Sequence, residues 1–362
     1  MREATELNKE YLQGYLAQLW GSPSLEVTAI AKYPRGLSRE TWSVDCANAG
    51  SGRPGKLILR RDLRSQSVVA TSLRYEYDIY DRLKASKVPV AHTIIYEDDP
   101  AKLPDDRHFY LREQVEGDWD NPNYLNPDPR FDELRIAMAR EHVRKLALVH
   151  TCDWQALGFD QIMRAPKDVN DCVRNSIERY FNILAEFQME PLPILTEASE
   201  WLLDNAPTAP RISLLKGTNG RGEEIFRNGE IVAMADWEQA ALGDPASDFA
   251  RTQDFFNDIV HDGKKIWGLQ IALDYYEELT GIHIPPQSVQ FYHALNCFEN
   301  NVSLHHAAVP LANGTDRSVR LVWLSTEAMH YSNMMLLGTV AQKQIDASLV
   351  YSTQTKAVKE DA

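Results

Sequence analysis

The sequence predicts an α+β protein with two lobes, a small β-rich N-terminal lobe and a large, mainly helical C-terminal lobe. Three observations lead to this prediction. Short runs of β-branched and aromatic residues between turn residues fill the region up to residue 115. Apolar residues at helical spacing dominate after residue 131, and one β-rich island at 211–236 interrupts them. We therefore expect an N-terminal lobe at 1–115, a C-terminal lobe at 116–345 and a polar tail at 346–362.

The N-terminal lobe is expected to begin with an amphipathic helix. Leu7, Leu12, Leu16 and Leu19 recur at helical spacing, and the polar residues between them leave no apolar core of the kind a signal peptide needs. A second helix is expected at 67–84, just before Pro89. Short β-type runs occur at 27–30, 41–44, 56–60 and 109–111. The prediction for this lobe after its first helix is the order β-β-β-α-β-β, a small antiparallel sheet with one helix.

The C-terminal lobe is expected to follow an irregular, Pro- and Asn-rich connection at 119–130. Helical periodicity then covers 131–152, 169–187 and 195–205. After the β-rich island, the pattern predicts further helices to residue 345.

Composition and charge exclude several classes of protein. The 362 residues carry 52 acidic and 38 basic side chains, for a net charge of −14, which argues against a nucleic-acid partner. No apolar run approaches the ~20 residues of a membrane helix, so no membrane partner is expected. The four cysteines are scattered and form no Cys-x-x-Cys pair. We expect a cytoplasmic protein, and the sequence leaves its oligomeric state open.

The strongest local pattern is a hairpin that ends in a carboxylate. Asn228 and Gly229 lie between the β-type runs 224–226 and 231–235, a combination typical of a type I′ turn. Asp236 follows directly at the end of the second run, where a strand would hold its side chain rigidly. Six acidic residues and only one arginine lie within 236–258, so their mutual repulsion calls for a cation or backbone donors. Helix capping is the alternative for some of them, since Asp244 precedes a proline.

Upstream of this hairpin, three glycines lie within 217–222, a composition that lets backbone approach a ligand closely. An ordinary glycine-rich turn has the same composition.

Together these elements resemble the aminoglycoside phosphotransferase family, within the protein-kinase-like fold, over residues 25–330. The most specific part is the run DWEQAALGDPASD at 236–248. It resembles the family pattern DWE-x-A-x-x-GDP-x-x-D in the branch found beside acyl-CoA dehydrogenases. In that family the first aspartate, here Asp236, binds magnesium on the nucleotide phosphates. Leu148-Val149-His150 resembles the end of the helix before the catalytic loop.

The resemblance also implies a site for the nucleotide. The run RGLSRET at 35–41, with Gly36 and Ser38, resembles the loop over the nucleotide. Arg60 stands where the family has a phosphate-binding lysine, and Glu76 resembles the helix glutamate that pairs with it. A surface ion pair is the alternative for these two residues.

Residues 109–117 resemble the connection between the lobes, whose backbone meets adenine, so Glu113 and Val115 are expected at the nucleotide. The implied cofactors are ATP and Mg²⁺.

The catalytic loop departs from the family pattern His-Gly-Asp-x-x-x-x-Asn. The aligned residues are Lys216, Gly217, Thr218 and Glu223. A threonine hydroxyl cannot act as the general base that an aspartate provides. Glu223 is an oxygen ligand and a candidate second magnesium ligand. Lys216 would add positive charge near the transferred phosphoryl group, and Glu224 is a candidate for the missing base.

Three interpretations follow from this loop. The chain is a phosphotransferase with a rebuilt loop, acting on an alcohol group, because a loose transition state needs little help from a base. Alternatively, it binds nucleotide and carries out different chemistry. In the third interpretation it is inactive and binds a nucleotide, a small ligand or a partner.

Aromatic residues in the C-terminal lobe point to the substrate class. Within 288–337, Phe291, Tyr292, Phe298, Trp323 and Tyr331 occur with few acidic residues. They are typical of helix core, but a pocket lined by them would suit a hydrophobic hydroxyl compound better than a polycation. The histidines of this region lack metal-ligand spacing, so no zinc site is expected.

Overall fold

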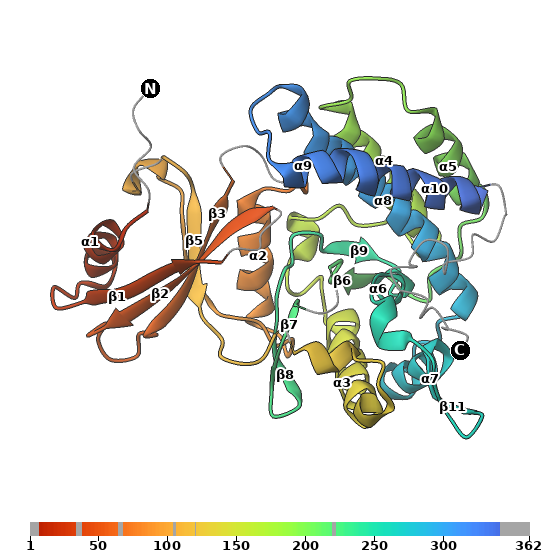
Figure 1. Ribbon diagram of the computed structural model, residues 1–362, viewed down its shortest axis with the longest axis horizontal. Coiled ribbons are helices and arrows are strands. Elements are labelled where there is room, and N and C mark those ends of the chain that lie inside the picture. Colours follow the sequence, from red (N-terminus) through yellow and green to blue (C-terminus); the bar gives the residue numbers. More distant parts are fainter. Residues whose placement is uncertain are drawn as a thin grey trace, which may run out of the picture.

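The structure, a computed structural model, describes residues 7–33, 38–63, 68–103, 106–119, 121–218 and 222–340. Gly36, the middle of the glycine-rich stretch at 219–221 and the expected tail at 346–362 lie outside these residues. The described chain has the two expected lobes, a β-rich N-terminal lobe and a mainly helical C-terminal lobe (Figure 1).

The N-terminal lobe is built on one antiparallel sheet with the strand order β1-β2-β3-β5-β4. Its strands are β1 (Glu26–Lys32), β2 (Arg39–Ala47), β3 (Lys56–Asp62), β4 (Thr93–Glu97) and β5 (Phe109–Glu113). Helix α1 (Lys9–Trp20) covers one face, where Leu12 and Leu16 pack on leucines of β3. Helix α2 (Leu73–Leu83) lies between the sheet and the C-terminal lobe (Figure 1). The order of strands and helices agrees with the prediction.

The C-terminal lobe begins after two short 3₁₀ turns in the connection, Pro122–Leu125 and Pro129–Phe131. Its helices are α3 (Asp132–Thr151), α4 (Cys172–Ala185), α5 (Pro193–Asp204), α6 (Ala246–Arg251), α7 (Leu269–Thr280), α8 (Pro286–Ala312), α9 (Val319–Trp323) and α10 (Met329–Val340). A single π-helical turn, Leu324–Ala328, joins α9 to α10. The three predicted helices at 131–205 correspond to α3, α4 and α5.

Three pairs of short strands lie within this lobe. Strands β7 (Glu224–Arg227) and β8 (Glu230–Met234) form the predicted hairpin, and Asn228 and Gly229 have φ values of 53° and 82°. Strand β6 (Ser213–Leu215) pairs with β9 (Ala241–Gly243). A further hairpin, β10 (Ile259–His261) and β11 (Lys264–Trp267), lies where the sequence predicted helix. Its Asp262-Gly263 turn has φ values of 52° and 72°, so the turn residues override the helical pattern.

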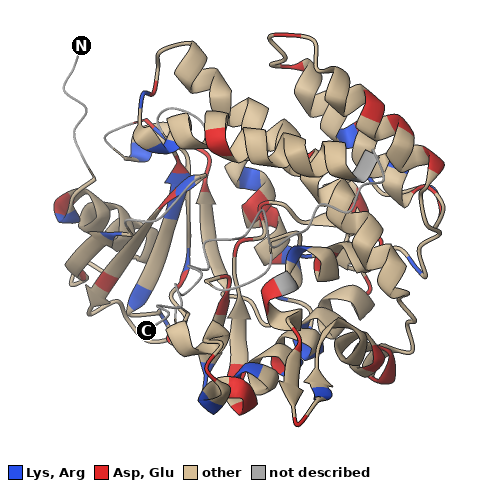
Figure 2. Ribbon diagram, turned by 45° about the vertical axis from the view of Figure 1, so that its right-hand side comes forward, with Lys and Arg blue, Asp and Glu red and all other residues tan. Residues whose placement is uncertain are grey.

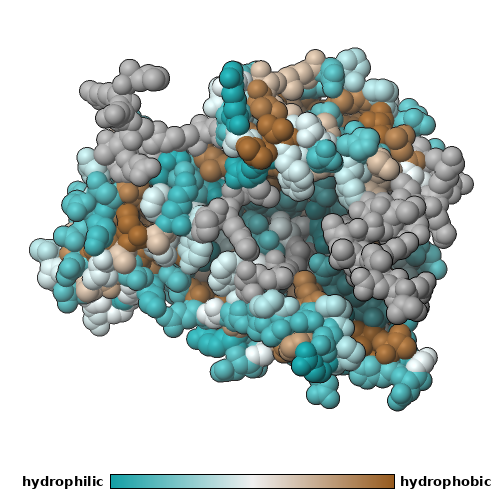
Figure 3. Space-filling model, in the orientation of Figure 1, coloured by the Kyte–Doolittle hydropathy of each residue, from teal (hydrophilic) through white to brown (hydrophobic). Residues whose placement is uncertain are grey.

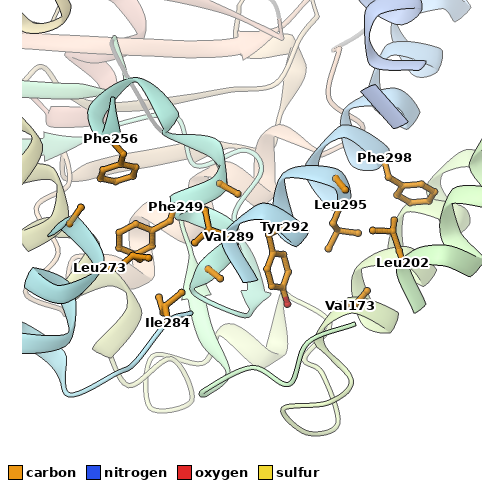
Figure 4. Packing of buried hydrophobic residues seen from close by; sticks show 14 of the residues in the cluster. Val173, Leu202, Phe249, Phe256, Leu273, Ile284, Val289, Tyr292, Leu295 and Phe298 are labelled. Carbon is orange, nitrogen blue, oxygen red and sulfur yellow. The ribbon is translucent and has the colours of Figure 1, made fainter. Parts of the chain in front are cut away.

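The helices α4, α5, α7 and α8 enclose the largest hydrophobic core. Phe249 and Phe256 pack against α7, and Tyr292, Leu295 and Phe298 project from α8 (Figure 4). Tyr292 and Phe298 therefore belong to this core. A second core joins the lobes, because Ile79 and Tyr80 of α2 pack with residues of α3 and of the β7–β8 region.

The surface of the chain carries mixed charge. Acidic and basic residues are distributed over both lobes (Figure 2). The face shown in Figure 3 is hollowed between the lobes, and the visible wall of the hollow is mainly hydrophilic. Among the described residues, no helix is both long and apolar enough to cross a membrane.

Candidate functional site

The first part of the candidate site is an ion pair between β3 and α2. Arg60 on β3 and Glu76 on α2 lie 2.9 Å apart, and the Tyr110 hydroxyl donates to Glu76 at 2.8 Å. Arg60 also donates to the Thr41 hydroxyl at 2.9 Å. Burial would raise the pKa of Glu76, but Arg60 and Arg39 outweigh it and hold the pKa below its ordinary value. The surroundings thus fix the guanidinium of Arg60 and keep both groups charged, which a surface pair would not require.

Asp236 lies next to this pair, directly after β8. Its Oδ1 is 3.8 Å from Nη2 of Arg60 and has no hydrogen-bond partner among the residues that the structure describes. The residue is in the left-handed region, with φ of 61°, and its N–H donates to the hydroxyl of Tyr80 at 3.2 Å. A non-glycine residue in this conformation is strained, and such strain is found mainly where the fold must aim a side chain. The carboxylate is thus held at the junction of the two lobes.

Glu223 faces Asp236 from the start of the β7–β8 hairpin. The Ala235 N–H donates to the Glu223 carbonyl at 2.7 Å, so Glu223 pairs with the residue directly before Asp236, and the two carboxyl side chains interact. Burial and the charge of Asp236 raise the pKa of Glu223 well above its ordinary value. Two carboxylates this close repel each other unless a proton or a cation lies between them.

These two carboxylates fit a magnesium ion that is shared with phosphate groups. Among the described residues, no cluster of three or more His, Cys, Asp or Glu side chains could hold a metal by itself. Magnesium in nucleotide sites is commonly bound by one or two carboxylates, with substrate phosphates and water completing the shell. The orphaned Oδ1 of Asp236 and the raised pKa of Glu223 are what such a shared site would show without its cation.

Glu238 is a further acidic residue of this site to which the sequence did not assign a role. It is buried, and its Oε2 has no hydrogen-bond partner within the described part of the chain. Burial, Asp236 and Glu76 together raise its pKa to about 8. Its position two residues after Asp236 was the available signal in the sequence.

Hydrogen bonds to the buried carboxylate of Asp248 hold the backbone of the loop Lys216–Thr218 in place. The N–H groups of Lys216 and Gly217 donate to the Asp248 carboxylate at 2.8 and 2.9 Å. His150 lies 3.0 Å from the same carboxylate through Nε2 and 3.0 Å from the Tyr276 hydroxyl through Nδ1. His150 therefore packs under the loop and supports it.

The side chains of Lys216 and Thr218 are turned into the protein, and the charge of Lys216 acts on Glu223. Lys216 is 0% exposed, and its Nζ donates to the Thr218 carbonyl and lies 5.8 Å from the centre of the Trp237 ring. The lysine thus braces the loop from inside. Thr218 is partly buried, and its hydroxyl has no hydrogen-bond partner in the described residues, which exclude 219–221. Its hydroxyl cannot act as a base, but Thr218 remains the residue that aligns with the aspartate of the family pattern.

The prediction that Glu224 supplies the missing base is wrong. Its side chain is 1% exposed and lies 3.3 Å from His142 of α3, inside the C-terminal lobe. Successive residues of a strand point to opposite faces, so Glu223 faces Asp236 and Glu224 faces the core. A base must come within hydrogen-bond reach of its substrate, and this burial excludes Glu224 from that role.

The residues expected at the nucleotide lie at or near the ends of strands in the N-terminal lobe. Ser38 is buried directly before β2. Glu113 accepts a hydrogen bond from the His92 N–H at 3.1 Å, and Val115 is partly buried beside the core that joins the lobes. Gly117 approaches β7 so closely that a Cβ would lie 2.5 Å from the Phe226 carbonyl oxygen. This close contact fixes the connection between the lobes.

A cavity of about 320 Å³ opens beside the Lys216–Thr218 loop. Its walls come from the start of α2, from α4 and α8, and from residues 239–251. Apolar side chains and several buried polar groups line it together. Its volume is that of a small-molecule site.

The fold and this cleft define the class of protein. The sheet of the N-terminal lobe, the Arg60–Glu76 pair and a carboxylate at the junction of the lobes belong to a protein-kinase-like fold. The model of the phosphotransferase enzyme family matches residues 30–278, and the chain belongs to this family.

Solved structures share the fold at low sequence identity. A Ralstonia eutropha protein, solved as a candidate aminoglycoside phosphotransferase, is 21% identical, with a TM-score of 0.65 over 93% of this chain and 99% of that one. A mutant of aminoglycoside phosphotransferase APH(4)-Ia, in complex with ADP and hygromycin B, is 14% identical, with a TM-score of 0.54 over 91% and 98% of the chains. The macrolide 2′-phosphotransferase MphH of Brachybacterium faecium is 16% identical, with a TM-score of 0.53 over 91% and 97%.

Longer proteins contain a similar segment. Mouse acyl-CoA dehydrogenase family member 10 is 24% identical over 69% of this chain and 22% of its own length. Rat acyl-CoA dehydrogenase family member 11 is 22% identical over 78% of this chain and 34% of its own length. The chain therefore spans at most about a third of these relatives.

Proposed function

We propose that the chain is a phosphotransferase that uses ATP and Mg²⁺ to phosphorylate a hydroxyl group of a small molecule. The observation that carries this proposal is the arrangement of Arg60, Glu76 and Asp236 at the junction of the lobes. Phosphoryl transfer requires positioning and charge neutralisation more than covalent chemistry. A partly buried, permanently charged guanidinium beside a rigid carboxylate supplies both. APH(4)-Ia, which shares the fold, was solved with ADP and with AMP-PNP.

Each residue then has a defined task. Arg60, held by Glu76, would bind the phosphates of the nucleotide. Asp236 and Glu223 would hold Mg²⁺, which neutralises charge on the phosphate oxygens when it is bound. Ser38, Glu113 and Val115 would line the nucleotide site. Asp248 and Lys216 would keep the loop in place.

No residue of the loop can accept the substrate proton as an aspartate would. A transition state in which the bond to the leaving group is largely broken needs little base assistance. We therefore expect slow transfer, with the hydroxyl proton passing to solvent or to a phosphate oxygen.

The test is nucleotide binding, measured by calorimetry with ATP in the presence of Mg²⁺ or of a chelator. We expect magnesium-dependent binding by the wild type and a loss of roughly tenfold or more in Asp236→Asn, because a metal ligand is removed. Asp254→Asn, at an exposed position, is the matched control and should bind like the wild type. Binding that is absent, or that is the same for Asp236→Asn, contradicts the proposal.

The second candidate is a protein that binds nucleotide or ligand without transfer. Thr218 in place of the base and the inward-facing Lys216 favour it. A screen of hydroxyl compounds for ADP release separates the two. Magnesium-dependent ATP binding without ADP release from any compound supports the second candidate.

A further inference from the structure

The cavity beside the Lys216–Thr218 loop has a charge pattern that indicates what it binds. Gly217 and Gln239 form part of its wall, so a ligand there would lie next to the proposed transfer site. The charged residues around it are Arg164, Arg179, Arg251, Asp244 and Glu299.

Two of the three arginines are neutralised by neighbours. Arg251 forms an ion pair with Glu299, and Ser176 also donates to Glu299. Arg164 pairs with Glu178 at the surface. Carboxylates of the protein neutralise these two arginines, so neither offers a net positive charge to a ligand.

Arg179 is different. It lies on α4 with its guanidinium 5.5 Å from the centre of the Tyr180 ring. Throughout the described part of the chain, it has no hydrogen bond and no carboxylate oxygen within 4.0 Å. Glu299 acts on it only at longer range, and the carboxylate of Glu299 is already engaged by Arg251. A partly buried guanidinium without an acceptor is costly, so its usual partner is a carboxylate or a phosphate.

The same cavity also contains a polar atom that lacks a donor. Asn175, on α4 like Arg179, is 4% exposed, and its Oδ1 has no hydrogen-bond partner among the described residues. Asp244 is 1% exposed, and its carboxylate interacts with the Tyr292 hydroxyl. Buried polar atoms are nearly always satisfied, so Oδ1 of Asn175 indicates a donor on a ligand, such as a hydroxyl group. The cavity thus offers the guanidinium of Arg179 as a donor and, separately, oxygen atoms that can accept hydrogen bonds.

We propose that this cavity binds an acceptor that carries an oxyanion group, a carboxylate or a phosphate, in addition to its hydroxyl, and that Arg179 binds the oxyanion. The inference rests on the proposed function, because it takes the cavity as the acceptor site of the transfer. A polycationic acceptor is disfavoured, since it would bring further positive charge to an unpaired guanidinium.

The test uses four probes with the same six-carbon chain and a terminal hydroxyl. They are 6-hydroxyhexanoate, 6-hydroxyhexyl phosphate, 1,6-hexanediol and 6-amino-1-hexanol. Binding of each is measured by calorimetry on the wild type, Arg179→Gln and Arg179→Lys. Arg174→Gln, an exposed arginine of the same helix, is the matched control.

We expect one or both anionic probes to bind at least tenfold more tightly than the diol and the amine. The carboxylate and phosphate arms show which oxyanion is preferred. Arg179→Gln should lose this preference, Arg179→Lys should keep part of it, and Arg174→Gln should keep all of it. Retention by the lysine variant shows that charge, and not folding, is responsible.

Three results would overturn the inference: no binding of either anionic probe, equal binding of all four probes, or unchanged preference in Arg179→Gln. Titration of the same variants with ATP and Mg²⁺ separates this outcome from failure of the proposed function. Anion binding without nucleotide binding would refute the transferase while leaving the assignment of Arg179 in place.

Discussion

Replacing Glu76 with glutamine should destabilise the whole protein, although the two side chains have nearly the same shape. Glu76 is 1% exposed and lies 2.9 Å from Arg60, 2.8 Å from the Tyr110 hydroxyl and 4.0 Å from Arg39. The substitution removes the buried carboxylate between two arginines, and leaves Arg60 with Asp236 at 3.8 Å and Arg39 with Asp62 at 3.0 Å. Removing one partner of a buried pair costs about 3–5 kcal/mol when the other charge is left uncompensated, so these remaining carboxylates place the cost at about 3 kcal/mol. We expect a loss of this size in the free energy of unfolding.

The assay is urea unfolding followed by fluorescence. Glu116→Gln is the control, since Glu116 pairs with Lys56 at 2.6 Å at the surface, where its side chain is 67% exposed. Surface pairs contribute little, so this control should unfold like the wild type. A loss below about 1 kcal/mol in Glu76→Gln would refute the reasoning that the buried pair holds Arg60 in place.

The pH dependence provides a second readout of the same pair. The pKa of Glu76 lies below its ordinary value in the folded protein. Its stabilising contribution is therefore complete above the ordinary glutamate pKa, and it is lost as the pH falls through the lower folded value. Wild type should lose stability in this acid range more steeply than Glu76→Gln. Parallel curves would show that the pair does not contribute.

Two further substitutions test the loop and the cavity. Gly217→Ala should cost roughly 1–3 kcal/mol and displace the loop, because φ is +82° and the new Cβ would lie 2.3 Å from the Gln239 carbonyl oxygen. Gly222→Ala is its control for thermal unfolding, with φ of +93° but open space, and an equal loss in both would contradict a role for the close contact. Asp244→Asn should be more stable than wild type at pH 7.5, and less so at pH 4, because burial raises the pKa of Asp244 from 3.8 to about 6. Between these two pKa values the folded wild type binds a proton that the unfolded chain has released. The wild type therefore loses up to about 3 kcal/mol of unfolding free energy as the pH rises across this range, whereas Asp244→Asn does not. The same pH dependence of the unfolding free energy in both proteins would contradict this prediction.

Local patterns determined much of the fold. The Asn228-Gly229 turn specified its hairpin because both residues tolerate positive φ, and the hairpin places Asp236 at the end of a strand. The helical spacing of apolar residues on α2 determined which of its side chains are buried. The Asp262-Gly263 turn carried the same kind of signal, but the surrounding helical periodicity obscured it.

The sequence by itself determined the order of the elements and the identity of residues such as Arg60, Glu76 and Asp236, because these depend on local spacing and on the resemblance of short motifs. Only the tertiary structure decided how the charges are used. Glu224 turns into the core and Lys216 lies beneath its own loop, whereas Arg179 lines the cavity with no carboxylate partner in the described part of the chain. Partners of buried charges come from distant parts of the chain, and the cost of burial depends on all of them together. That information is absent from any local pattern and arises only when the lobes pack.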